Sequence, residues 1–374
     1  MPLPNSTDAI DPGYLEPLLR AFLGEPRLTV GTINIEPLGR GTSAANLYTV
    51  VVQPAYGSNP VRLVLKLDAP GHLTEVQFYR DLAGRVDVDT PRVLDARIVG
   101  DGRAWLLIED LAHAKDGLAW TEADYHDVVR DMARFHASLW EQTDSVDDCR
   151  WLWRPTREAT QEQVAALRDH LATIESSGLA RAVPDILSRK RLFLIKDVLE
   201  RSEDVLRPML AAGTTLVHGD YWFYNVQVLP HGRRVLLDWQ ECRVWSGLWE
   251  LAYFLNLLHV AGRRRFSYRE QLPVPEETLI GWYAEGLRAR GVALTHGVFE
   301  DALACAYIWH PLLHWLPRLA QIGEEATRLP AWSLLSRTPP AVSALLAAAG
   351  YGAARRFLAT TFDRWECAVN NRFG

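Results

Sequence analysis

Four polar side chains interrupt one apolar stretch of this chain, LVHGDYWFYNVQVLPHGRRVLLDWQ, and they are His218, Asp220, Asn225 and Asp238. Buried without partners, each would cost free energy, so each needs a partner or a function. The runs VQVL and RVLLDW flank the turn PHGR and predict a β-hairpin. Pairing of these runs brings Asn225 and Asp238 to the same edge.

These residue types are those of a magnesium site beside a catalytic carboxylate. Asn225 and Asp238 offer the hard oxygen ligands that Mg²⁺ prefers. Asp220 remains available to accept or orient the proton of a hydroxyl group. The structural alternative is that the two carboxylates and the amide cap a turn and a following helix, with His218 as a hydrogen-bonded imidazole.

Lys66 interrupts the apolar, strand-like run LVLKL. Nine residues later, Glu75 lies on a predicted helix, HLTEVQFYRDL. A buried lysine that is paired with a helix glutamate can hold its ammonium group against nucleotide phosphates. The alternatives are that Lys66 extends to the edge of the sheet and that Glu75 is a solvated acid stabilised by the helix dipole.

The segment PLGRGTSAANLYTV contains a turn rich in small and hydroxyl residues, with Gly39 and Gly41 inside it. Such a turn lets backbone N–H groups approach phosphate oxygens closely. An ordinary hairpin turn explains the two glycines equally well.

The first 110 residues carry the signals of a small sheet. A helix is predicted over 13–24, where helical apolar spacing ends on a glycine. Five strand-like runs follow, TINIEPL, NLYTVVVQ, VRLVLKLD, PRVLDARIV and RAWLLIED. A helix over 71–84 separates the third run from the fourth. Residues 1–110 are therefore expected to form a sheet-based lobe.

Beyond Leu111 the apolar pattern becomes helical. The segment TEADYHDVVRDMARFHASLWEQ, residues 121–142, begins with a threonine N-cap and has i, i+3, i+4 spacing. Further helices are predicted over 156–177, 183–206, 275–290, 297–322 and 341–361. Residues 111–374 are expected to form a larger helical lobe that carries the hairpin.

Composition narrows the classes of partner. The chain has 374 residues, of which 48% are hydrophobic and 23% charged, and a formal net charge of -6, which argues against a nucleic-acid-binding surface. Its four cysteines lie far apart without metal-ligand spacing and indicate a reducing compartment. Neither a leader pattern nor a long apolar run is present, so a soluble, cytoplasmic protein with no membrane partner is expected. The oligomeric state is left open.

The sequences HGDYWFYN and LLDWQ resemble the HGDxxxxN and D-aromatic-x signatures of the aminoglycoside phosphotransferase/choline-kinase-like enzymes, small-molecule relatives of protein kinases. The strand lysine, the connector LLIEDL and the helix MARFHASLWE extend the resemblance over most of the chain. Trp222, DWQ and ELAYFL are nearest in motif to the ecdysteroid-kinase-like branch. The implied fold is α+β and bilobal, with a five-stranded antiparallel sheet plus a helix in the N-lobe and a mostly helical C-lobe whose inserted hairpin carries the catalytic residues.

The resemblance also implies a role for each matching residue of the hairpin segment. Asp220 corresponds to the catalytic aspartate, with His218 in a supporting role. Asn225 and Asp238 correspond to the residues that hold Mg²⁺.

In the N-lobe, the resemblance implies a nucleotide site. Lys66 would contact the α and β phosphates and be positioned by Glu75. The turn containing Gly39, Gly41 and Thr42 would cover the phosphates, and backbone groups from Glu109 to Leu111 would read the adenine edge.

The chain departs from related patterns at three points. Gln240 stands where protein kinases have the glycine of DFG, so a flipping activation segment is not expected. Glu250, in LWELAYFL, occupies a position often held by aspartate in this family, where its usual role is structural. The interval between Lys66 and Glu75 is short.

The implied reaction transfers the γ-phosphoryl group of ATP, with Mg²⁺, to a hydroxyl group of a small molecule. The sequence does not distinguish ATP from GTP. From Ala261 onward ten acidic residues stand against thirteen arginines, which does not suit a polycationic acceptor. The same region is rich in aromatic and imidazole side chains, which favours a partly apolar alcohol such as an antibiotic-like natural product, with ordinary helix packing as the alternative. These residues are Trp282, Tyr283, Tyr307, Trp309, His310, His314, Trp315, Trp332 and Trp365.

Other functions compete with this hypothesis. An aminoglycoside, amino-sugar or amino-alcohol kinase and a non-catalytic nucleotide-binding pseudokinase are the nearest alternatives. A protein kinase is disfavoured because DFG and APE sequences are absent. A metal hydrolase that uses His218, Asp220 and Asp238 fits the order of the motifs less well.

Overall fold

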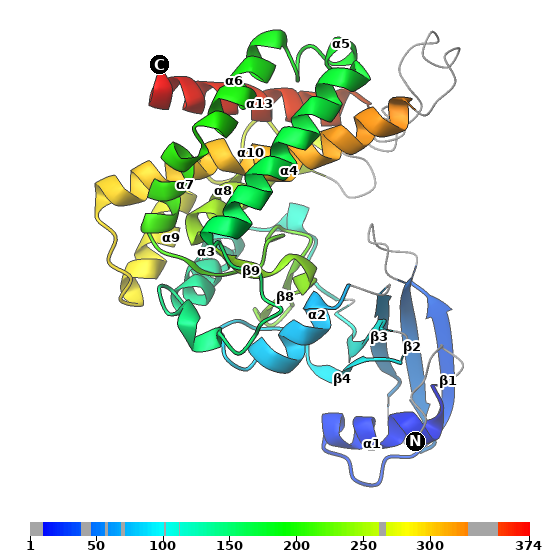
Figure 1. Cartoon of the computed structure of the whole chain (residues 1–374). Helices are drawn as coiled ribbons and strands as arrows, with labels where there is room; N and C mark the ends of the chain where they lie inside the picture. Colours follow the sequence, from blue (N-terminus) through cyan, green and yellow to red (C-terminus); the bar gives the residue numbers. More distant parts are fainter. Residues whose placement is uncertain are drawn as a thin grey trace.

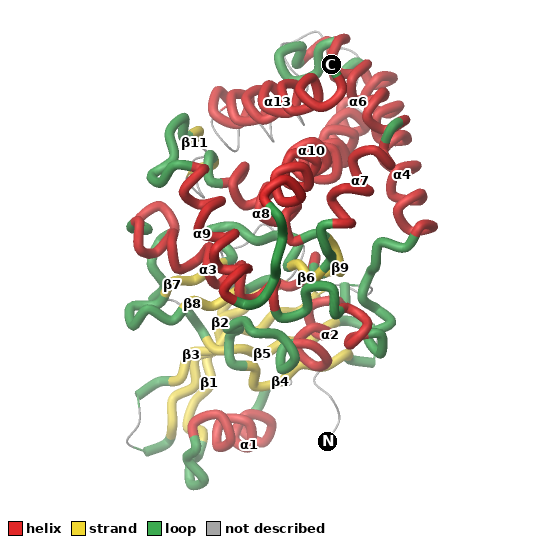
Figure 2. Tube along the Cα trace, turned by 90° about the vertical axis from the view of Figure 1, so that its left-hand side faces the viewer, coloured by secondary structure: helices red, strands yellow, loops and turns green. Residues whose placement is uncertain are grey.

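The chain folds into a sheet at one end and a larger helical region at the other (Figure 1). The computed structural model describes residues 10–38, 46–56, 59–68, 72–100, 102–111, 113–261, 267–327 and 351–374. Helix α1 lies beside the sheet, and the C-terminal helix α13 lies at the opposite end of the molecule. Figure 2 shows the same division from the side, with β1 to β5 below most of the helices and α1 beneath the strands.

The sheet contains the five strands that the sequence predicts. They are β1 (Val30–Pro37), β2 (Asn46–Pro54), β3 (Val61–Asp68), β4 (Val93–Ile98) and β5 (Ala104–Glu109). Their order is β1-β2-β3-β5-β4, and every neighbouring pair is antiparallel. The predicted five-stranded antiparallel sheet is therefore confirmed.

The two faces of β3 have different partners because side chains alternate along a strand. Leu63 and Leu65 pack in one core with residues of α1 (Pro12–Leu23). Val64 packs on the other face, in the core that contains Val76 of α2. Lys66 is two residues from Val64, so the sheet directs it toward α2 and the helical region.

The helix predicted over 71–84 is shorter and differently wound than expected. The α-helical part, α2 (Thr74–Gln77), is a single turn, and a π-helical turn, η2 (Phe78–Leu82), continues it. Ala83 N donates to Phe78 O, an i to i+5 bond. A π turn inserts an extra residue into the helix. Glu75 and Phe78 lie at its start, one helical turn apart, and so face the same side.

The helical region begins after β5. Its elements before the hairpin are η3 (Gly117–Ala119), α3 (Glu122–Ala137), η4 (Thr143–Val146), α4 (Arg157–Ser177), α5 (Leu179–Ala182), α6 (Arg189–Glu200) and α7 (Ser202–Ala211). Those from β6 onward, which include the hairpin β7–β8, are β6 (Thr215–Val217), β7 (Val226–Val228), β8 (Arg234–Leu236), η5 (Trp239–Glu241), β9 (Arg243–Trp245), α8 (Gly247–Leu257), β10 (Val260–Ala261), β11 (Ser267–Tyr268), α9 (Glu276–Ala289), α10 (His296–Thr327) and α13 (Tyr351–Phe373).

Three helix predictions need correction. The helix predicted over 121–142 ends at Ala137. The helix predicted over 183–206 is two helices, because α6 begins only after the Ser188 N-cap and the backbone leaves helical geometry at Arg201. The last predicted helix, 341–361, lies partly outside the described residues, and its described part extends to Phe373.

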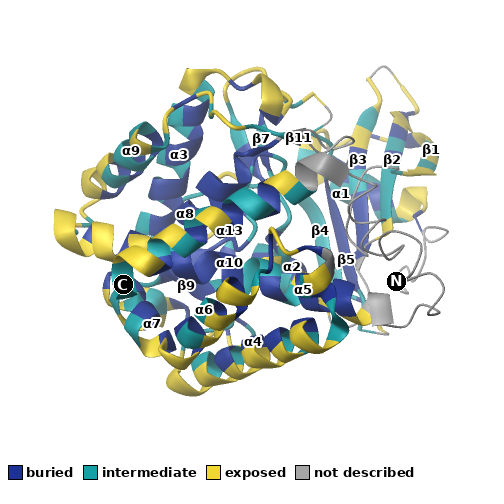
Figure 3. Ribbon diagram, turned by 90° about the horizontal axis from the view of Figure 1, so that it is seen from above, coloured by how far each residue is buried: buried dark blue, intermediate teal, exposed yellow. Residues whose placement is uncertain are grey.

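The helical region surrounds one fully buried helix. Every residue of α8 is buried, and Figure 3 shows it as a dark blue segment among the other helices. Contacts from α10 and β6 cover it. A helix that is apolar on all sides is stable only in a protein interior. The packing around α8 therefore holds its polar side chains, and the groups bonded to them, in place.

Candidate active site

The predicted hairpin brings two of the candidate metal ligands together. Strands β7 and β8 pair antiparallel, with Val226 opposite Leu236. Leu237 N donates to Asn225 O at 2.9 Å, so Asn225 lies across from the residue that precedes Asp238. The sequence does not predict the second strand pair, β6 with β9, which anchors the segment on either side of the hairpin.

Lys66 joins the sheet to the hairpin. Its Nζ lies 2.5 Å from Glu75 Oε2 and 2.8 Å from Asp238 Oδ1. The lysine side chain is only 8% exposed. A charge this poorly hydrated requires compensation, and one carboxylate from each region provides it.

A second contact reinforces this junction. Trp239 N donates to Glu75 Oε1 at 3.4 Å, and the Trp239 ring stacks on that of Phe78 with centroids 3.7 Å apart and planes 7° apart. Glu75 and Phe78 are one helical turn apart, and Trp239 follows Asp238 directly. Glu75 and Phe78 therefore both contact Trp239, the residue that follows Asp238.

Asp238 has an unusual backbone conformation. Its φ and ψ angles are both 65°, in the left-handed region, where aspartate is tolerated better than most residues. This turn ends β8 and starts the 3₁₀ turn η5 (Trp239–Glu241). It directs the carboxylate toward Lys66 instead of along the strand.

His218 connects the two halves of the site. Its Nε2 donates to Leu237 O at 2.7 Å, and its Nδ1 accepts from Asp220 N at 3.2 Å. Burial lowers the pKa of His218, although the nearby Glu250 carboxylate opposes that shift. A neutral imidazole with this tautomer ties the backbone at Asp220 to the backbone beside Asp238, which is a supporting role.

Asp220 lies in the turn between β6 and β7. Its Oδ2 accepts from Asn225 Nδ2 at 2.9 Å, and its Oδ1 accepts from the Tyr253 hydroxyl group. Burial raises the pKa of Asp220 to about 7, although the Tyr253 hydrogen bond acts in the opposite direction. A carboxylate that titrates near neutral pH suits a group that takes up a hydroxyl proton.

Glu250 holds the backbone that precedes Asp220. It is fully buried and accepts from the N–H groups of His218, at 2.9 Å, and Gly219. His136 Nε2 lies 2.9 Å from Glu250 Oε2. Burial alone would raise the pKa of Glu250, but the hydrogen bond from His136 and the nearby charges lower it below its usual value. The structural role expected for this position is what the geometry shows.

Gly219 fits this turn for two reasons. Its φ angle is +83°, and a Cβ atom there would lie 2.2 Å from Glu241 O. Glycine alone has the freedom and the space that this position requires.

Tyr253 is the contact of Asp220 that the sequence patterns do not reveal. It is a buried residue of α8, and its ring contacts Trp249, His310 and His314 at centroid distances of 5.6, 5.2 and 4.8 Å. It follows Glu250 by three residues, a spacing that places both on one helix face. That spacing within ELAYFL is the one available signal.

The connector from Glu109 to Leu111 is only partly available for a ligand. The Glu109 carboxylate pairs with Arg233 at 2.9 Å and accepts from Arg92 N at 2.8 Å. The Glu109 N–H donates to Arg92 O. The side chain and the N–H group of Glu109 are thus both occupied within the fold, and the contact of connector backbone groups with a base stays a prediction.

The remaining predicted residues are Gly39, Gly41 and Thr42, and they lie outside the described residues. The cysteines provide no metal site: among the described residues, no cluster of three or more His, Cys, Asp or Glu side chains could hold a metal ion. Within the same part of the chain, no helix has the length and apolar character needed to cross a membrane.

The donor set nevertheless fits Mg²⁺ bound together with a nucleotide. Asn225 uses its Nδ2 for two bonds to Asp220, at 2.9 Å each, which turns its amide oxygen away from that residue. The Asp238 side chain is 35% exposed, so it combines a contact to Lys66 with access from solvent. Mg²⁺ in phosphate-bound sites takes one or two protein oxygens and completes its shell with phosphates and water.

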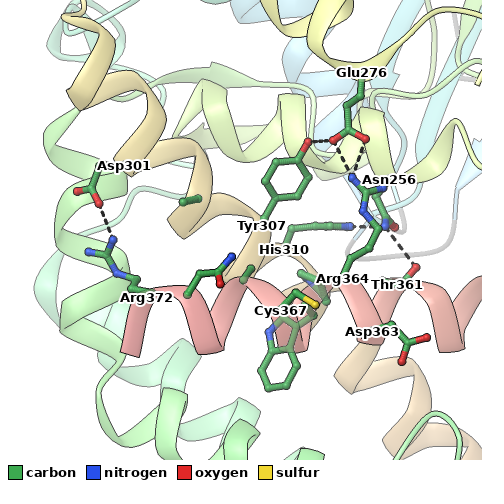
Figure 4. Close-up of a pocket in the computed structure, with 15 residues that line it drawn as sticks. Asn256, Glu276, Asp301, Tyr307, His310, Thr361, Asp363, Arg364, Cys367 and Arg372 are labelled. Carbon is green, nitrogen blue, oxygen red and sulfur yellow. Dashed lines mark hydrogen bonds and ion pairs between the residues drawn. The ribbon is translucent and has the colours of Figure 1, made fainter. Parts of the chain in front are cut away.

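A separate cavity of about 670 Å³ lies between α8, α10 and α13 (Figure 4). Glu276 on one wall accepts from Arg364, at 2.7 and 2.6 Å, and from the Tyr307 hydroxyl group. His310 lines the cavity and also packs against Tyr253. His310 therefore joins the lining of the cavity to the Tyr253 ring, and Asp220 does not line the cavity.

Comparison with known proteins identifies the family. The model of the phosphotransferase enzyme family matches residues 34–291, which is more than half of the chain. The chain belongs to this phosphotransferase family. No curated protein sequence matches it. The ecdysteroid-kinase-like branch remains a prediction.

Solved structures of small-molecule phosphotransferases share the fold. Macrolide 2'-phosphotransferase MphH from Brachybacterium faecium is 14% identical with a TM-score of 0.50, over 89% of this chain and 97% of that one. The GDP complex of an aminoglycoside 2'-phosphotransferase-IIIa mutant is 12% identical with a TM-score of 0.51, over 97% and 99%. Choline kinase from Cryptosporidium parvum Iowa II is 9% identical with a TM-score of 0.54, over 91% and 89%. These likenesses establish the α+β, kinase-like fold of this phosphotransferase.

Proposed function

We propose that this phosphotransferase moves the γ-phosphoryl group of ATP to a hydroxyl group of a small molecule in a Mg²⁺-dependent reaction. The observation that carries the proposal is the position of Lys66, a buried ammonium group held between Glu75 and Asp238. This arrangement places a positive charge, a candidate metal ligand and the hydrogen-bonded Asp220–Asn225 pair in one site. Such a site suits phosphoryl transfer, in which positioning and charge neutralisation provide most of the acceleration.

In this mechanism Asp220 accepts or orients the proton of the acceptor hydroxyl group. Asn225 and Asp238 hold Mg²⁺, which when bound neutralises charge on the phosphates. Lys66 contacts the α and β phosphates, and Glu75 fixes its position. His218 supports Asp220 by holding its backbone N–H.

The proposed nucleotide site includes two further segments. We propose that the turn with Gly39, Gly41 and Thr42 covers the phosphates and that backbone groups from Glu109 to Leu111 meet the base. The division into a nucleotide-binding lobe, 1–110, and a catalytic and substrate-binding lobe, 111–374, follows from this assignment. ATP and GTP both remain candidate donors, and one solved relative is a GDP complex.

For the acceptor we propose a partly apolar alcohol of the natural-product or antibiotic-like kind. The groups packed around Tyr253, beside Asp220, include Trp249, His310 and His314. Burial lowers the pKa of His310 to about 3 and that of His314 well below its usual value, so both rings are neutral. Cations on this side include Arg318, near Asp220, and Arg243, which lies over the Trp249 ring at 4.9 Å. This environment is apolar and weakly cationic, which suits a neutral acceptor better than a polyamine.

Not every aromatic residue of the late helices supports this acceptor. Tyr283, Trp309 and Trp365 are fully buried in the core, and the Trp365 indole donates to Ile308 O at 2.9 Å. Tyr283 and Trp309 are helix-packing residues, and Trp365 packs in the core and also lines the separate cavity. Two members of the set, His310 and His314, pack against Tyr253. Trp315 packs against His314.

Two alternatives follow from the same site. Aminoglycoside or amino-alcohol phosphorylation is supported by the solved relatives, which include an aminoglycoside phosphotransferase and a choline kinase. A nucleotide-binding pseudokinase would keep the Lys66 pairing but would not require the hydrogen bonds to Asp220.

The test combines a screen with one variant. ATP consumption is measured against a library of hydroxylated natural products and aminoglycosides, and a product that is heavier by about 80 mass units identifies phosphorylation. Asp220→Ala should abolish transfer and leave Mg-ATP binding nearly unchanged. Full turnover by Asp220→Ala with a confirmed acceptor would refute the assignment, and activity confined to aminoglycosides would favour the first alternative.

A further inference from the structure

One helix holds the catalytic segment by two side chains. Glu250 binds the backbone N–H groups of His218 and Gly219, and Tyr253 binds the carboxylate of Asp220. The two are three residues apart on α8, whose residues are all buried. The position of the Asp220 carboxylate relative to its own backbone is therefore determined by a single rigid element.

The Tyr253 hydroxyl group is a neutral donor at all ordinary pH values. Burial and the charge of Asp220 raise the pKa of Tyr253 well above its usual value. The ring is stacked on Trp249 at an interplanar angle of 26° and packs against two histidines of α10. Its hydroxyl group can only point where the packed ring directs it, and that is toward Asp220 Oδ1.

Few side chains around Asp220 could hold its carboxylate in place by a hydrogen bond. Among the residues that the structure describes, Asn225 and Tyr253 are the side chains that donate hydrogen bonds to its carboxylate. Charged or titratable neighbours of Asp220 or Tyr253 include Asp238 and His218 from the hairpin segment, Arg243 from β9, Arg318, His310 and His314 from α10, and Glu250 from α8. Asn225 is also a candidate Mg²⁺ ligand, so its orientation has to satisfy two demands. The hydroxyl group of Tyr253, by contrast, has one hydrogen bond to satisfy, the one to Asp220 Oδ1.

We propose that Tyr253 is a positioning residue for phosphoryl transfer: its hydroxyl group fixes Asp220 Oδ1, so that the remaining lone pairs of the carboxylate face the acceptor hydroxyl group. This inference rests on the proposed function. As the acceptor oxygen bonds to the γ-phosphorus, the bond from that phosphorus to the β–γ bridging oxygen breaks and ADP leaves with the electron pair. The acceptor proton passes to the Asp220 carboxylate, and Tyr253 keeps its own proton throughout.

The structure offers a closely matched control. Tyr307 on α10 also donates its hydroxyl group to a carboxylate, that of Glu276, in the separate cavity (Figure 4). Tyr253→Phe and Tyr307→Phe each remove one oxygen atom and one phenol–carboxylate hydrogen bond. Only the first affects Asp220.

Single-turnover cleavage of [γ-³²P]ATP with Mg²⁺, with water as the acceptor, is measured in the wild type, Tyr253→Phe, Asp220→Ala, the double variant of these two, and the control Tyr307→Phe. Tyr253→Phe should lower the rate about tenfold or more with an unchanged Kd for Mg-ATP, because orientation is lost and nucleotide binding is not. Tyr307→Phe should match the wild type. In the Asp220→Ala background, adding Tyr253→Phe should change nothing further, since a positioning residue acts only through its partner.

The outcomes separate this inference from the proposed function. If Asp220→Ala cleaves ATP as fast as the wild type, the proposed function fails. If Asp220 is required but Tyr253→Phe matches the wild type, or slows both backgrounds equally, the positioning role alone is wrong. If Tyr253→Phe does not fold, ¹³Cζ-tyrosine spectra of wild type and Asp220→Asn replace it: the Tyr253 resonance should move while that of Tyr307 stays, and an unmoved Tyr253 resonance overturns the inference.

Discussion

His136 Nε2 lies 2.9 Å from Glu250 Oε2, and both side chains are completely buried. The other nitrogen of the imidazole, Nδ1, is 2.7 Å from the Tyr283 hydroxyl group. Glu250 also accepts from two backbone N–H groups of the turn that precedes Asp220. The pair therefore connects α3 to the turn that carries Asp220 through one buried carboxylate.

Replacement of Glu250 by glutamine should destabilise the protein by about 3 kcal/mol, because an amide cannot accept from both backbone N–H groups and the imidazole. The pKa of Glu250 is lowered in the folded state. Its contribution is therefore present above the unfolded value and lost as pH falls through the folded one, so the difference between wild type and variant should shrink below about pH 4.5. Urea denaturation at several pH values measures this. Glu277→Gln, an exposed acid in the first turn of α9, is the control and should be nearly neutral.

Lys66→Met should lower the rate of phosphoryl transfer about a hundredfold and weaken binding of Mg-ATP, because the ammonium group that faces the phosphates is lost. Arg62 is on the same strand, but half of its side chain is exposed and it pairs with Asp110. Arg62→Met is therefore the matched loss of a cation and should leave both values near those of the wild type. Isothermal titration with a non-hydrolysable nucleotide and Mg²⁺ provides the binding measurement. Equal effects of the two substitutions would argue against a phosphate contact by Lys66.

Gly219→Ala should destabilise the protein by about 3 kcal/mol or more, since its Cβ atom would overlap Glu241 O in addition to the strain of a positive φ angle. Gly232 is the comparison: its φ angle is +77°, but nothing lies within 4 Å of the position that a Cβ atom would occupy. Gly232→Ala should cost only about 1 kcal/mol. Thermal unfolding of both variants separates backbone strain from crowding. Similar losses would mean that the turn at Gly219 relaxes easily.

Arg364→Gln should destabilise the protein by about 1 kcal/mol, because its two bonds to Glu276 link α13 to the start of α9 across a partly solvated wall. Arg356→Gln, at an exposed position of the same helix, should have no measurable effect. Hydrogen exchange along α13 gives a local readout: the helix should open more often in Arg364→Gln. Unchanged exchange would show that apolar packing alone holds α13.

The sequence predicts those parts of the fold that short-range patterns determine. Alternation identifies the five strands, and the turn PHGR identifies the hairpin that brings Asn225 beside Leu237 and Asp238. The pairing of Lys66 with Glu75 is also a hypothesis that the sequence supports, and the two side chains do meet.

Long-range contacts are beyond such patterns. Tyr253 reaches Asp220 across 33 positions, and its partner choice depends on how α8 packs inside the helical region. The stack of Phe78 on Trp239 also escapes prediction, because the two residues are distant in the chain. The break at Arg201 has no proline or glycine to signal it.

The left-handed backbone of Asp238 limits which amino acids can replace it during evolution. Glutamate would keep the charge but is poorly suited to that conformation, whereas glycine would suit the conformation but has no ligand to offer. Asparagine fits the backbone and lacks the charge that balances Lys66. Nearly every single amino-acid replacement therefore loses either the backbone conformation or the charged ligand. Active descendants of this protein should retain aspartate at this position long after the surrounding apolar residues have been exchanged.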